Sequence, residues 1–442
     1  FETQETYLIL RKIISIVQRV LSKETFSCLN IPSTMILKEL SANGRGTLSR
    51  FIGFCYKSGI QKIQSTFSAL KQFLSQHTST FDFSSIEVGS TIVPLMRTLC
   101  QVPFCESIVF SRLDKNETTN TFSSLIKYGS NNLKHLLIKG QIPNEFWAII
   151  SKMYQNSKIH LTGISFLDCN ITERDLLSIQ QLMISKKMNS ISLQNSLLFT
   201  KLSMPFSSFF VPSLTENLLM LNLDKTSRLN LEQLFKCIPN IYSLSLSGCE
   251  LDIIDTINCI NQSKMDRLML LNLSNNFCKS RFTDLSFPKL LLRLDVNGIS
   301  FGAKNLPLFF EKLMNNDWND GLILSMSSIK AFESDWKHLF EVMGKTKIVP
   351  LLRLTWTDNK IDNDSFYSFL SLCTRLQYLN ISRCLSSNLS SVFYKFNNSI
   401  VNLPLLNTII LTGHEKYPLQ NALEPFLTNL INLRSIRILD IS

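Results

Sequence analysis

The sequence predicts an α/β solenoid in which short parallel strands alternate with helices, and three observations lead to this fold class. A hexapeptide pattern, LxxLxL with an apolar residue at each L, recurs along most of the chain. Its copies are separated by a nearly constant spacing, and the segments between them carry apolar residues at helical spacing. The chain has 442 residues, of which 45% are hydrophobic and 18% charged, which is typical of an ordered protein.

The hexapeptide pattern has fourteen copies that start between residues 78 and 436, with a mean spacing of about 27.5 residues. This spacing is that of a long, ribonuclease-inhibitor-like leucine-rich repeat. One repeat cannot bury its apolar side alone, so neighbours must stack into a horseshoe with parallel concave strands and convex helices. The copies are TSTFDF (78), CESIVF (105), LKHLLI (133), LTGISF (161), MNSISL (188), LLMLNL (218), IYSLSL (241), LMLLNL (268), LLRLDV (291), NDGLIL (319), LLRLTW (351), LQYLNI (376), LNTIIL (406) and IRILDI (436).

The segments between the copies predict the helices. In PNEFWAIISKMYQ, Asn144 is a candidate cap. The apolar residues that follow it share one helical face: Phe146, Ile149, Ile150 and Met153. Trp356 occupies a core position of its strand, so we interpret it as a residue that packs in the core.

Cys249, in IYSLSLSGCELD (241–252), raises the question of whether it is a reactive thiol. The repeat consensus continues L-x-x-L-x-L-x-x-N/C-x-L, and Cys249 occupies the Asn/Cys slot with Leu251 after it. A small polar side chain there can hydrogen-bond the backbone as the strand turns away, so we interpret Cys249 as scaffold. The other predicted slot residues are Cys169, Ser196, Thr226, Asn276, Ser327, Asn359, Cys384 and His414.

Residues 1–77 lie outside the repeat and predict a helical, basic N-terminal region. IQKIQSTFSALKQFLS places five apolar residues on one face: Ile60, Ile63, Phe67, Leu70 and Leu74. We expect this region to cap the first repeat. The alternative is contact with an acidic partner or an anionic membrane surface through Arg11, Lys12 and Arg19, because much of the net charge of +11 lies in the first 80 residues.

Residues 78–442 form the predicted leucine-rich repeat domain of about 14 repeats. RILDIS at the end of the chain resembles QYLNIS (377–382), which indicates that the sequence stops partway through a repeat. The chain contains no stretch of 18 uncharged apolar residues that would predict a membrane-spanning helix.

No motif in the sequence predicts catalysis. GISFG (298–302) matches the G-x-S-x-G of hydrolases, but it lies at a strand-to-helix turn of the repeat, far from a suitable histidine. Walker, HExxH and GxGxxG motifs are absent, and the eleven cysteines form no CxxC pair. We therefore expect no catalytic residue, metal, cofactor or small-molecule substrate. Nucleic acid is disfavoured because no basic run is interleaved with aromatic residues.

The outward strand positions on the concave face are the candidate binding site. They are rich in polar residues with scattered aromatics, which suits a protein partner better than phosphate, since tyrosine and arginine are frequent hot-spot residues. The candidate partner-binding residues are Lys134, His135, Tyr242, Met269, Arg293, Asp295, Arg353, Gln377, Tyr378 and Asn380.

Several motifs at similar phase, LNLSNN, LNLDKTS, LSGCEL and LTWTDNKIDNDSF, resemble the repeats of the CARMIL proteins, regulators of actin capping protein. A longer insertion with PFSSFF (205–210) adds to this resemblance, which covers residues 78–442. It implies a cytoplasmic, non-enzymatic scaffold at the membrane-proximal actin cortex. Two alternatives remain open: a regulator of a small GTPase, because solenoids related to the Ran GTPase activators share this architecture, and a membrane-associated signalling adaptor.

Overall fold

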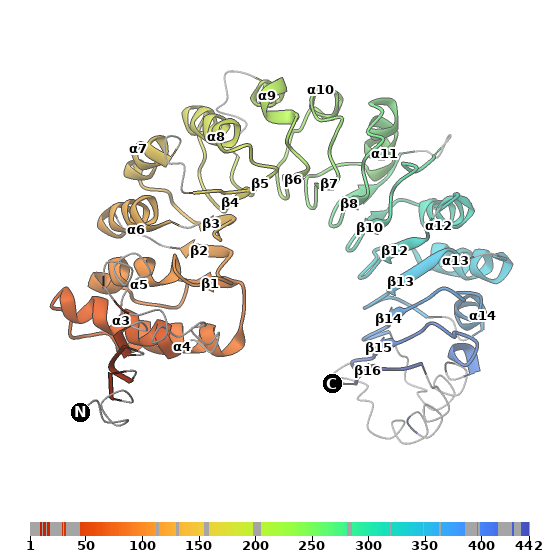
Figure 1. Cartoon of the computed structure of the whole chain (residues 1–442). Coiled ribbons are helices and arrows are strands. Elements are labelled where there is room, and N and C mark those ends of the chain that lie inside the picture. Colours follow the sequence, from red (N-terminus) through yellow and green to blue (C-terminus); the bar gives the residue numbers. More distant parts are fainter. Residues whose placement is uncertain are drawn as a thin grey trace. The chain divides into compact units, whose positions relative to one another are not determined.

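The chain divides into two compact units, Phe1–Ser203 and Met204–Ser442. The computed structural model in Figure 1 describes most of both units. The described residues are 45–111, 115–129, 132–153, 159–197, 205–280, 285–318, 320–347, 349–361, 364–384, 398–413 and 435–441, with 9–10, 12–14, 16–17, 29, 31, 396 and 427.

In the first unit, parallel strands pair in chain order, each with the next. Parallel neighbours need a crossover connection, and a helix supplies it between each strand and the next. The strands are β1 (Thr80–Asp82), β2 (Ser107–Ser111), β3 (His135–Lys139), β4 (Gly163–Leu167) and β5 (Ser190–Gln194). The helices are α5 (Ile92–Leu99), preceded by the turn η2 (Gly89–Thr91), α6 (Lys115–Tyr128), α7 (Asn144–Met153) and α8 (Glu173–Lys186).

Side chains alternate along β3 and β5 as the repeat pattern predicts, whereas β2 buries three residues in a row. In β3, Leu136 and Ile138 are buried while the residues between them are partly exposed. Helix α7 buries the four apolar residues of its predicted face. A row of phenylalanine rings runs through this core, with neighbouring centroids 4.9 to 6.3 Å apart: Phe73, Phe81, Phe83, Phe110, Phe122, Phe146 and Phe166.

Helices α3 (Arg45–Lys57) and α4 (Gln64–Gln76) pack at the start of the first unit. The hydroxyls of Thr66 and Thr91 are 2.8 Å apart in a buried hydrogen bond that joins α4 to η2. The guanidinium of Arg97, on α5, lies 4.1 Å from the centre of the Phe54 ring of α3. These contacts pack α3 and α4 against η2 and α5 of the first repeat.

Helix α4 begins four residues later than its apolar pattern predicts. Ile60 and Ile63 precede the helix, whose buried residues are Thr66, Leu70, Phe73 and Leu74. Gly59 adopts a φ of 68° at the end of α3, and the Ile60 N–H donates to the carbonyl of Cys55. The chain therefore uses residues 60–63 as the link between the two helices.

In the second unit, nine described strands pair in parallel in chain order. They are β6 (Met220–Asn222), β7 (Ser243–Ser245), β8 (Leu270–Asn272), β10 (Arg293–Asp295), β12 (Leu322–Ser325), β13 (Leu351–Thr355), β14 (Tyr378–Asn380), β15 (Thr408–Ile410) and β16 (Ile438–Asp440). A separate parallel pair, β9 (Phe277–Cys278) and β11 (Ser300–Phe301), lies beyond the carboxyl ends of β8 and β10.

The helices of the second unit lie on one side of these strands, and the opposite side of the strands is open (Figure 1). We call the opposite side the open face. The helical segments are η4 (Phe206–Phe209), α9 (Pro212–Thr215), α10 (Leu231–Cys237), α11 (Ile253–Gln262), α12 (Asn305–Asn315), α13 (Glu333–Lys345) and α14 (Ser365–Ser371). The predicted α/β leucine-rich repeat solenoid is confirmed by this alternation of parallel strands and helices.

The Asn/Cys slot is built as predicted in most repeats. The Cys249 thiol lies 3.1 Å from the Leu223 carbonyl, and the Asn276 amide donates to the Leu246 carbonyl at 2.8 Å. Thr226 also fills its slot, but its buried hydroxyl has no hydrogen-bond partner within the described part of the chain. His414 lies outside the described residues.

The prediction for one repeat is wrong by two residues. Strand pairing aligns Leu294 with Leu324, so this repeat starts at Gly321 and its slot residue is Ile329, not Ser327. Glycine stands where the first leucine is expected because an added Cβ would lie 2.8 Å from the Leu352 side chain. A search for the LxxLxL pattern therefore misses the start at Gly321 and places it two residues earlier, at Asn319.

Candidate functional site

The structure places all ten predicted partner-binding residues outside the core, at partly or fully exposed positions. They occupy the second, third and fifth positions of the hexapeptide, whose fourth and sixth positions are buried. Lys134 and His135 belong to the first unit. The other eight lie on the open face of the second unit: Tyr242, Met269, Arg293, Asp295, Arg353, Gln377, Tyr378 and Asn380.

The two residues of the first unit are engaged with their neighbours. Lys134 forms an ion pair with Glu106 at 2.5 Å, and His135 Nε2 lies 2.8 Å from the hydroxyl of Ser165. The imidazole also lies against Gly163, where an added Cβ would come within 2.5 Å of Nδ1. Burial lowers the pKa of His135, so its ring is neutral at neutral pH.

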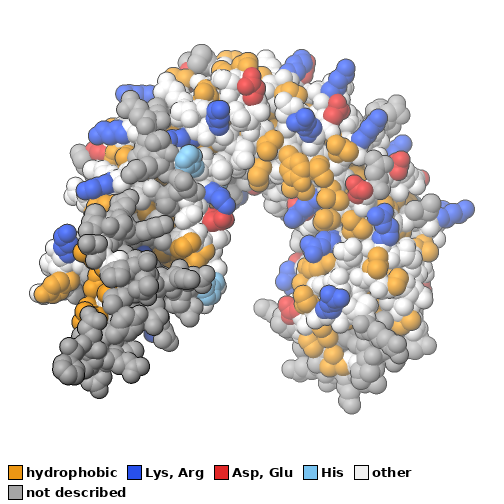
Figure 2. Space-filling model, in the orientation of Figure 1, with side chains coloured by type: hydrophobic (Ala, Val, Ile, Leu, Met, Phe, Trp, Pro, Cys, Tyr) orange, Lys and Arg blue, Asp and Glu red, His pale blue; other side chains and the backbone are white. Residues whose placement is uncertain are grey.

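The open face of the second unit carries large apolar side chains at positions that the fold does not require to be apolar. We call them the apolar strip: Leu219, Met220, Tyr242, Met269, Leu270 and Leu292. Leu219 is 40% exposed, Met220 46% and Tyr242 39%. Figure 2 shows hydrophobic side chains gathered on this part of the second unit.

Backbone hydrogen bonds hold the members of the apolar strip side by side. The Tyr242 N–H donates to the Leu219 carbonyl at 2.8 Å, and the Met269 N–H to the Tyr242 carbonyl at 3.0 Å. The Leu292 N–H then donates to the Met269 carbonyl at 2.9 Å. These four second-position residues therefore form one row across β6, β7, β8 and β10.

The same row in the first unit is polar. Equivalent backbone hydrogen bonds join its second-position residues Ser79, Glu106, Lys134, Thr162 and Asn189. Both units make the same strands with the same buried positions. The change from polar to apolar side chains is therefore local to the open face of the second unit.

Basic and aromatic residues continue the open face beyond the apolar strip. The register aligns Arg293 with Ile323, then with Arg353, then with Tyr378. The guanidinium of Arg353 lies 5.3 Å from the centre of the Tyr378 ring, a cation–π contact. The structure thus brings together Arg353 and Tyr378, which the sequence predicted separately, whereas Ile323 separates Arg353 from Arg293.

Arg293 is paired within its own strand. Its Nε donates to both carboxylate oxygens of Asp295, at 3.1 and 2.9 Å. Burial raises the pKa of Asp295, and the neighbouring guanidinium acts in the opposite direction.

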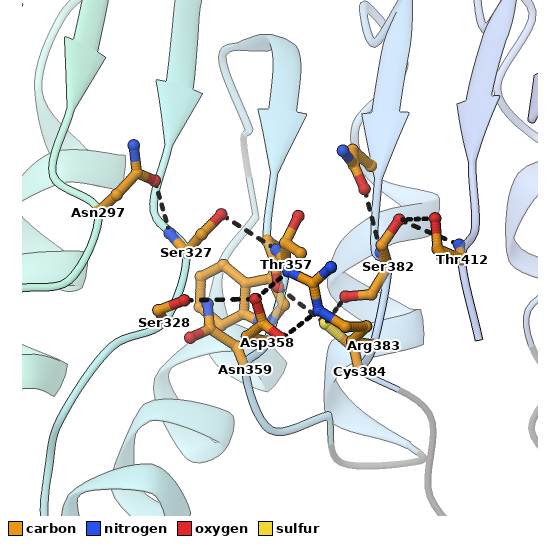
Figure 3. Close-up of polar contacts among 12 residues, drawn as sticks. Asn297, Ser327, Ser328, Thr357, Asp358, Asn359, Ser382, Arg383, Cys384 and Thr412 are labelled. Atoms are coloured by element: carbon orange, nitrogen blue, oxygen red, sulfur yellow. Dashed lines mark hydrogen bonds and ion pairs between the residues drawn. The ribbon is translucent and has the colours of Figure 1, made fainter. Parts of the chain in front are cut away.

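Polar side chains form a ladder near the carboxyl ends of the strands of the second unit (Figure 3). The Asn297 side-chain oxygen accepts from the Ser325 hydroxyl and the Ser327 N–H, both at 2.8 Å. The Ser382 hydroxyl accepts from the N–H of Thr412 at 3.0 Å. These bonds join the ends of successive strands.

An ion pair and an amide complete this ladder. The guanidinium of Arg383 donates through two nitrogens to the carboxylate of Asp358, each at 2.5 Å (Figure 3). The Asn380 side-chain oxygen accepts from the Ser382 N–H at 3.1 Å. The hydrogen-bonding groups of the ladder thus bind one another. We therefore assign this part of the open face a structural role.

The thiol of Cys249 has a structural role. The ten described free cysteines are buried or half-buried, and burial raises the pKa of Cys249 to about 12. At neutral pH this thiol is protonated and is a poor nucleophile. Among the described residues, no cluster of histidine, cysteine and carboxylate side chains could hold a metal ion.

A cavity of about 440 Å³ lies beside α11 and β9, away from the apolar strip. Its lining includes the carboxylates of Glu250, Asp252 and Asp255. Asp252 is used by the fold, because it caps α11 through the Ile254 N–H at 2.9 Å and accepts two further backbone N–H bonds. Asp252 therefore has a structural role, because it joins the start of α11 to the segment that follows β9.

The proposed membrane contact of the N-terminal region is described in part. Lys12 is exposed on a helical turn, whereas Arg11 and Arg19 lie outside the described residues. Among the described helices, none has the length and apolar character needed to cross a bilayer.

No protein-family model matches the chain, and no curated protein matches it. Among solved structures, it is similar to the chain in the crystal structure of a TLR13–ssRNA13 complex, with 17% identity and a TM-score of 0.38 over 82% of this chain and 50% of that chain. The chain thus spans about half the length of that relative.

A second similar structure is the leucine-rich repeat protein LIC12759 of Leptospira interrogans, with 14% identity and a TM-score of 0.35 over 78% of this chain and 86% of that chain. The resemblance to the CARMIL proteins rests on the sequence motifs alone. The regular repeat, the Asn/Cys slot and the order of the parallel strands make this chain a leucine-rich repeat solenoid.

Proposed function

We propose that the chain is a non-catalytic scaffold that binds a protein partner through the apolar strip on its second unit. The observation that carries this proposal is the row of Leu219, Tyr242, Met269 and Leu292, whose counterparts in the first unit are polar. Contiguous exposed apolar side chains with polar residues around them are typical of protein interaction sites.

The energetics favour burial of the strip against a partner. Covering a partly exposed leucine or methionine contributes on the order of 1 kcal/mol, and the strip offers five such side chains. Tyr242 adds an aromatic ring of the kind that dominates binding hot spots. The polar ladder contributes shape rather than affinity, because its hydrogen bonds are already made within the protein.

A protein fits this face better than a nucleic acid does. Nucleic-acid binding depends on cations that face phosphates. On the open face, Arg293 is paired with Asp295 and Arg383 with Asp358, so the exposed Arg353 and Arg437, three strands apart, are isolated cations and not a continuous basic row. The apolar side chains between β6 and β10 offer nothing to a phosphate backbone.

The CARMIL resemblance supplies the first partners to test, namely proteins of the actin cortex. A small GTPase is the alternative partner, and GTP hydrolysis assays with candidate GTPases distinguish a regulator from a passive scaffold. In either case the apolar strip is the proposed contact surface.

We expect Leu219→Asp to remove the partner while Leu308→Asp leaves it bound. Both leucines are 40% exposed, but Leu219 lies in the strip and Leu308 lies on α12, on the helical side. Burying a carboxylate in the interface weakens binding about tenfold or more. The measurement is affinity capture by the whole chain from cell extract, followed by titration of each captured protein.

Thermal melting of both variants is the control for folding. A captured protein whose binding falls with Leu219→Asp and not with Leu308→Asp supports the proposal. Equal retention by the two variants would show that the strip is not the binding surface.

A further inference from the structure

We propose that the partner presents a linear segment in which apolar residues cover the apolar strip and a carboxylate, farther along, binds Arg353. This inference rests on the proposed function and adds the chemistry of the partner. Two observations support this inference. Arg353 forms no ion pair among the described residues, and the strand register sets the distance between Arg353 and the apolar strip.

Arg353 differs from two other arginines of the open face, and it lies three strands away from Arg437 beside β16, which also forms no ion pair among the described residues. Arg293 is paired with Asp295, and Arg383 is paired with Asp358. Arg353 is exposed and forms no ion pair with any carboxylate that the structure describes. Its charge is therefore available to a partner.

The contact with Tyr378 prepares Arg353 for this role. The guanidinium lies over the ring, which restricts its position and leaves the edge of the planar group free. That edge presents parallel N–H donors, which match the two oxygens of a carboxylate. An aspartate or glutamate side chain is the group that this geometry best accommodates.

The register fixes the spacing between the two contacts. Leu270 aligns with Arg293, Ile323 and Arg353 on successive strands, so three strand spacings separate Leu270 from Arg353. At about 4.8 Å per strand this distance is about 14 Å, which an extended peptide covers in about four to five residues. The segment crosses half-buried apolar side chains on its way, among them Leu292 and Ile323.

The charge of the intervening surface does not oppose an acidic segment. Asp295 is the carboxylate nearest to this path in the register, and Arg293 pairs with it. We therefore expect a partner motif of one or two large apolar residues followed or preceded, about four to five positions away, by aspartate or glutamate.

The test is selection of random twelve-residue peptides on phage against the whole chain. We expect the enriched peptides to share this apolar and acidic pattern. Their affinity should fall about tenfold or more with Arg353→Glu, because a charge-assisted hydrogen-bond pair is lost and repulsion replaces it. Lys312→Glu, an exposed charge reversal on α12, is the matched control and should leave affinity unchanged.

Repeating the selection on the Arg353→Glu chain gives a second readout that unfolding cannot imitate. We expect lysine or arginine to replace the acidic residue at the same spacing. Peptides that lack a carboxylate, or that bind the two chains equally, would overturn the inference.

Two further outcomes separate this inference from the proposed function. If no peptide that depends on Leu219 is enriched, the linear segment is wrong, whereas the capture experiment still decides whether a folded protein binds the strip. If phosphatidylserine vesicles bind the chain and Leu219→Asp and Arg353→Glu both abolish that binding, the surface recognises a membrane and the peptide inference is overturned.

Discussion

Trp356→Ala should lower the free energy of unfolding by about 3–5 kcal/mol, the usual cost of removing a large ring from a core. Trp356 has no exposed surface and is among the largest fully buried side chains. Its ring makes edge contacts with Phe310 and Trp336, with centroids 6.4 and 6.1 Å away. Its loss therefore leaves a cavity shared by several repeats.

The measurement is the denaturant concentration at the midpoint of unfolding of the second unit. Hydrogen exchange of the backbone amides reports this unfolding in the whole chain. Trp356→Phe is the companion variant, since it keeps an aromatic ring but loses the Nε1 bond to the Lys360 carbonyl at 3.1 Å. Phe332→Ala is the control, because Phe332 is 59% exposed. Equal effects of Trp356→Ala and Phe332→Ala would contradict the assignment of Trp356 to the core.

Asn276→Ala should lower the free energy of unfolding by about 3 kcal/mol, because it leaves several buried backbone groups without partners. The Asn276 amide donates to the carbonyls of Leu246 and Leu273, at 2.8 and 2.9 Å. Its oxygen accepts from the Leu251 N–H at 3.1 Å. One side chain thus ties together three segments.

Asn276→Cys tests the physical reason for this slot. Cys249 and Cys384 occupy the same slot and donate their thiols to backbone carbonyls, at 3.1 and 2.8 Å. A cysteine at 276 should therefore recover part of the lost stability, with the denaturant midpoint as readout. If the cysteine variant were no more stable than the alanine variant, the slot would not depend on a hydrogen-bond donor.

Much of the fold is predictable from the sequence because its buried positions recur at a fixed spacing. The inward leucines, Trp356 and the slot residue Cys249 follow directly from the repeat frame. The frame fails at Gly321, where close packing against Leu352 selects glycine in place of leucine. Tertiary packing of this kind leaves no periodic signal in a single sequence.

The proposed contact surface was anticipated from the sequence only in part, for a related reason. Tyrosine and arginine attract notice individually, and Tyr242, Arg353 and Tyr378 were found in this way. Met269 was also predicted, but Leu219 and Met220 were missed because consecutive apolar residues in LLMLNL hide which of them face outward. Comparing the second hexapeptide position across all repeats would have identified Leu219, since that position is polar in the first unit.

The pairing of charges could not be derived from the sequence. Arg293, Arg353 and Arg383 are all arginines beside strands of similar pattern. The structure shows that two of them have carboxylate partners and that the guanidinium of Arg353 lies over an aromatic ring. This distinction depends on side-chain geometry between repeats.

The central claim is that the apolar strip is a protein-binding surface, and site-directed photo-cross-linking tests it most directly. A photoreactive phenylalanine analogue replaces Tyr242 in the strip or, in a second chain, Phe332, an exposed aromatic residue at the start of α13. We predict that Tyr242 gives a discrete cross-linked protein, that Phe332 does not, and that Leu219→Asp abolishes the product. Equal products from both positions, or a Tyr242 product that survives Leu219→Asp, would contradict the account.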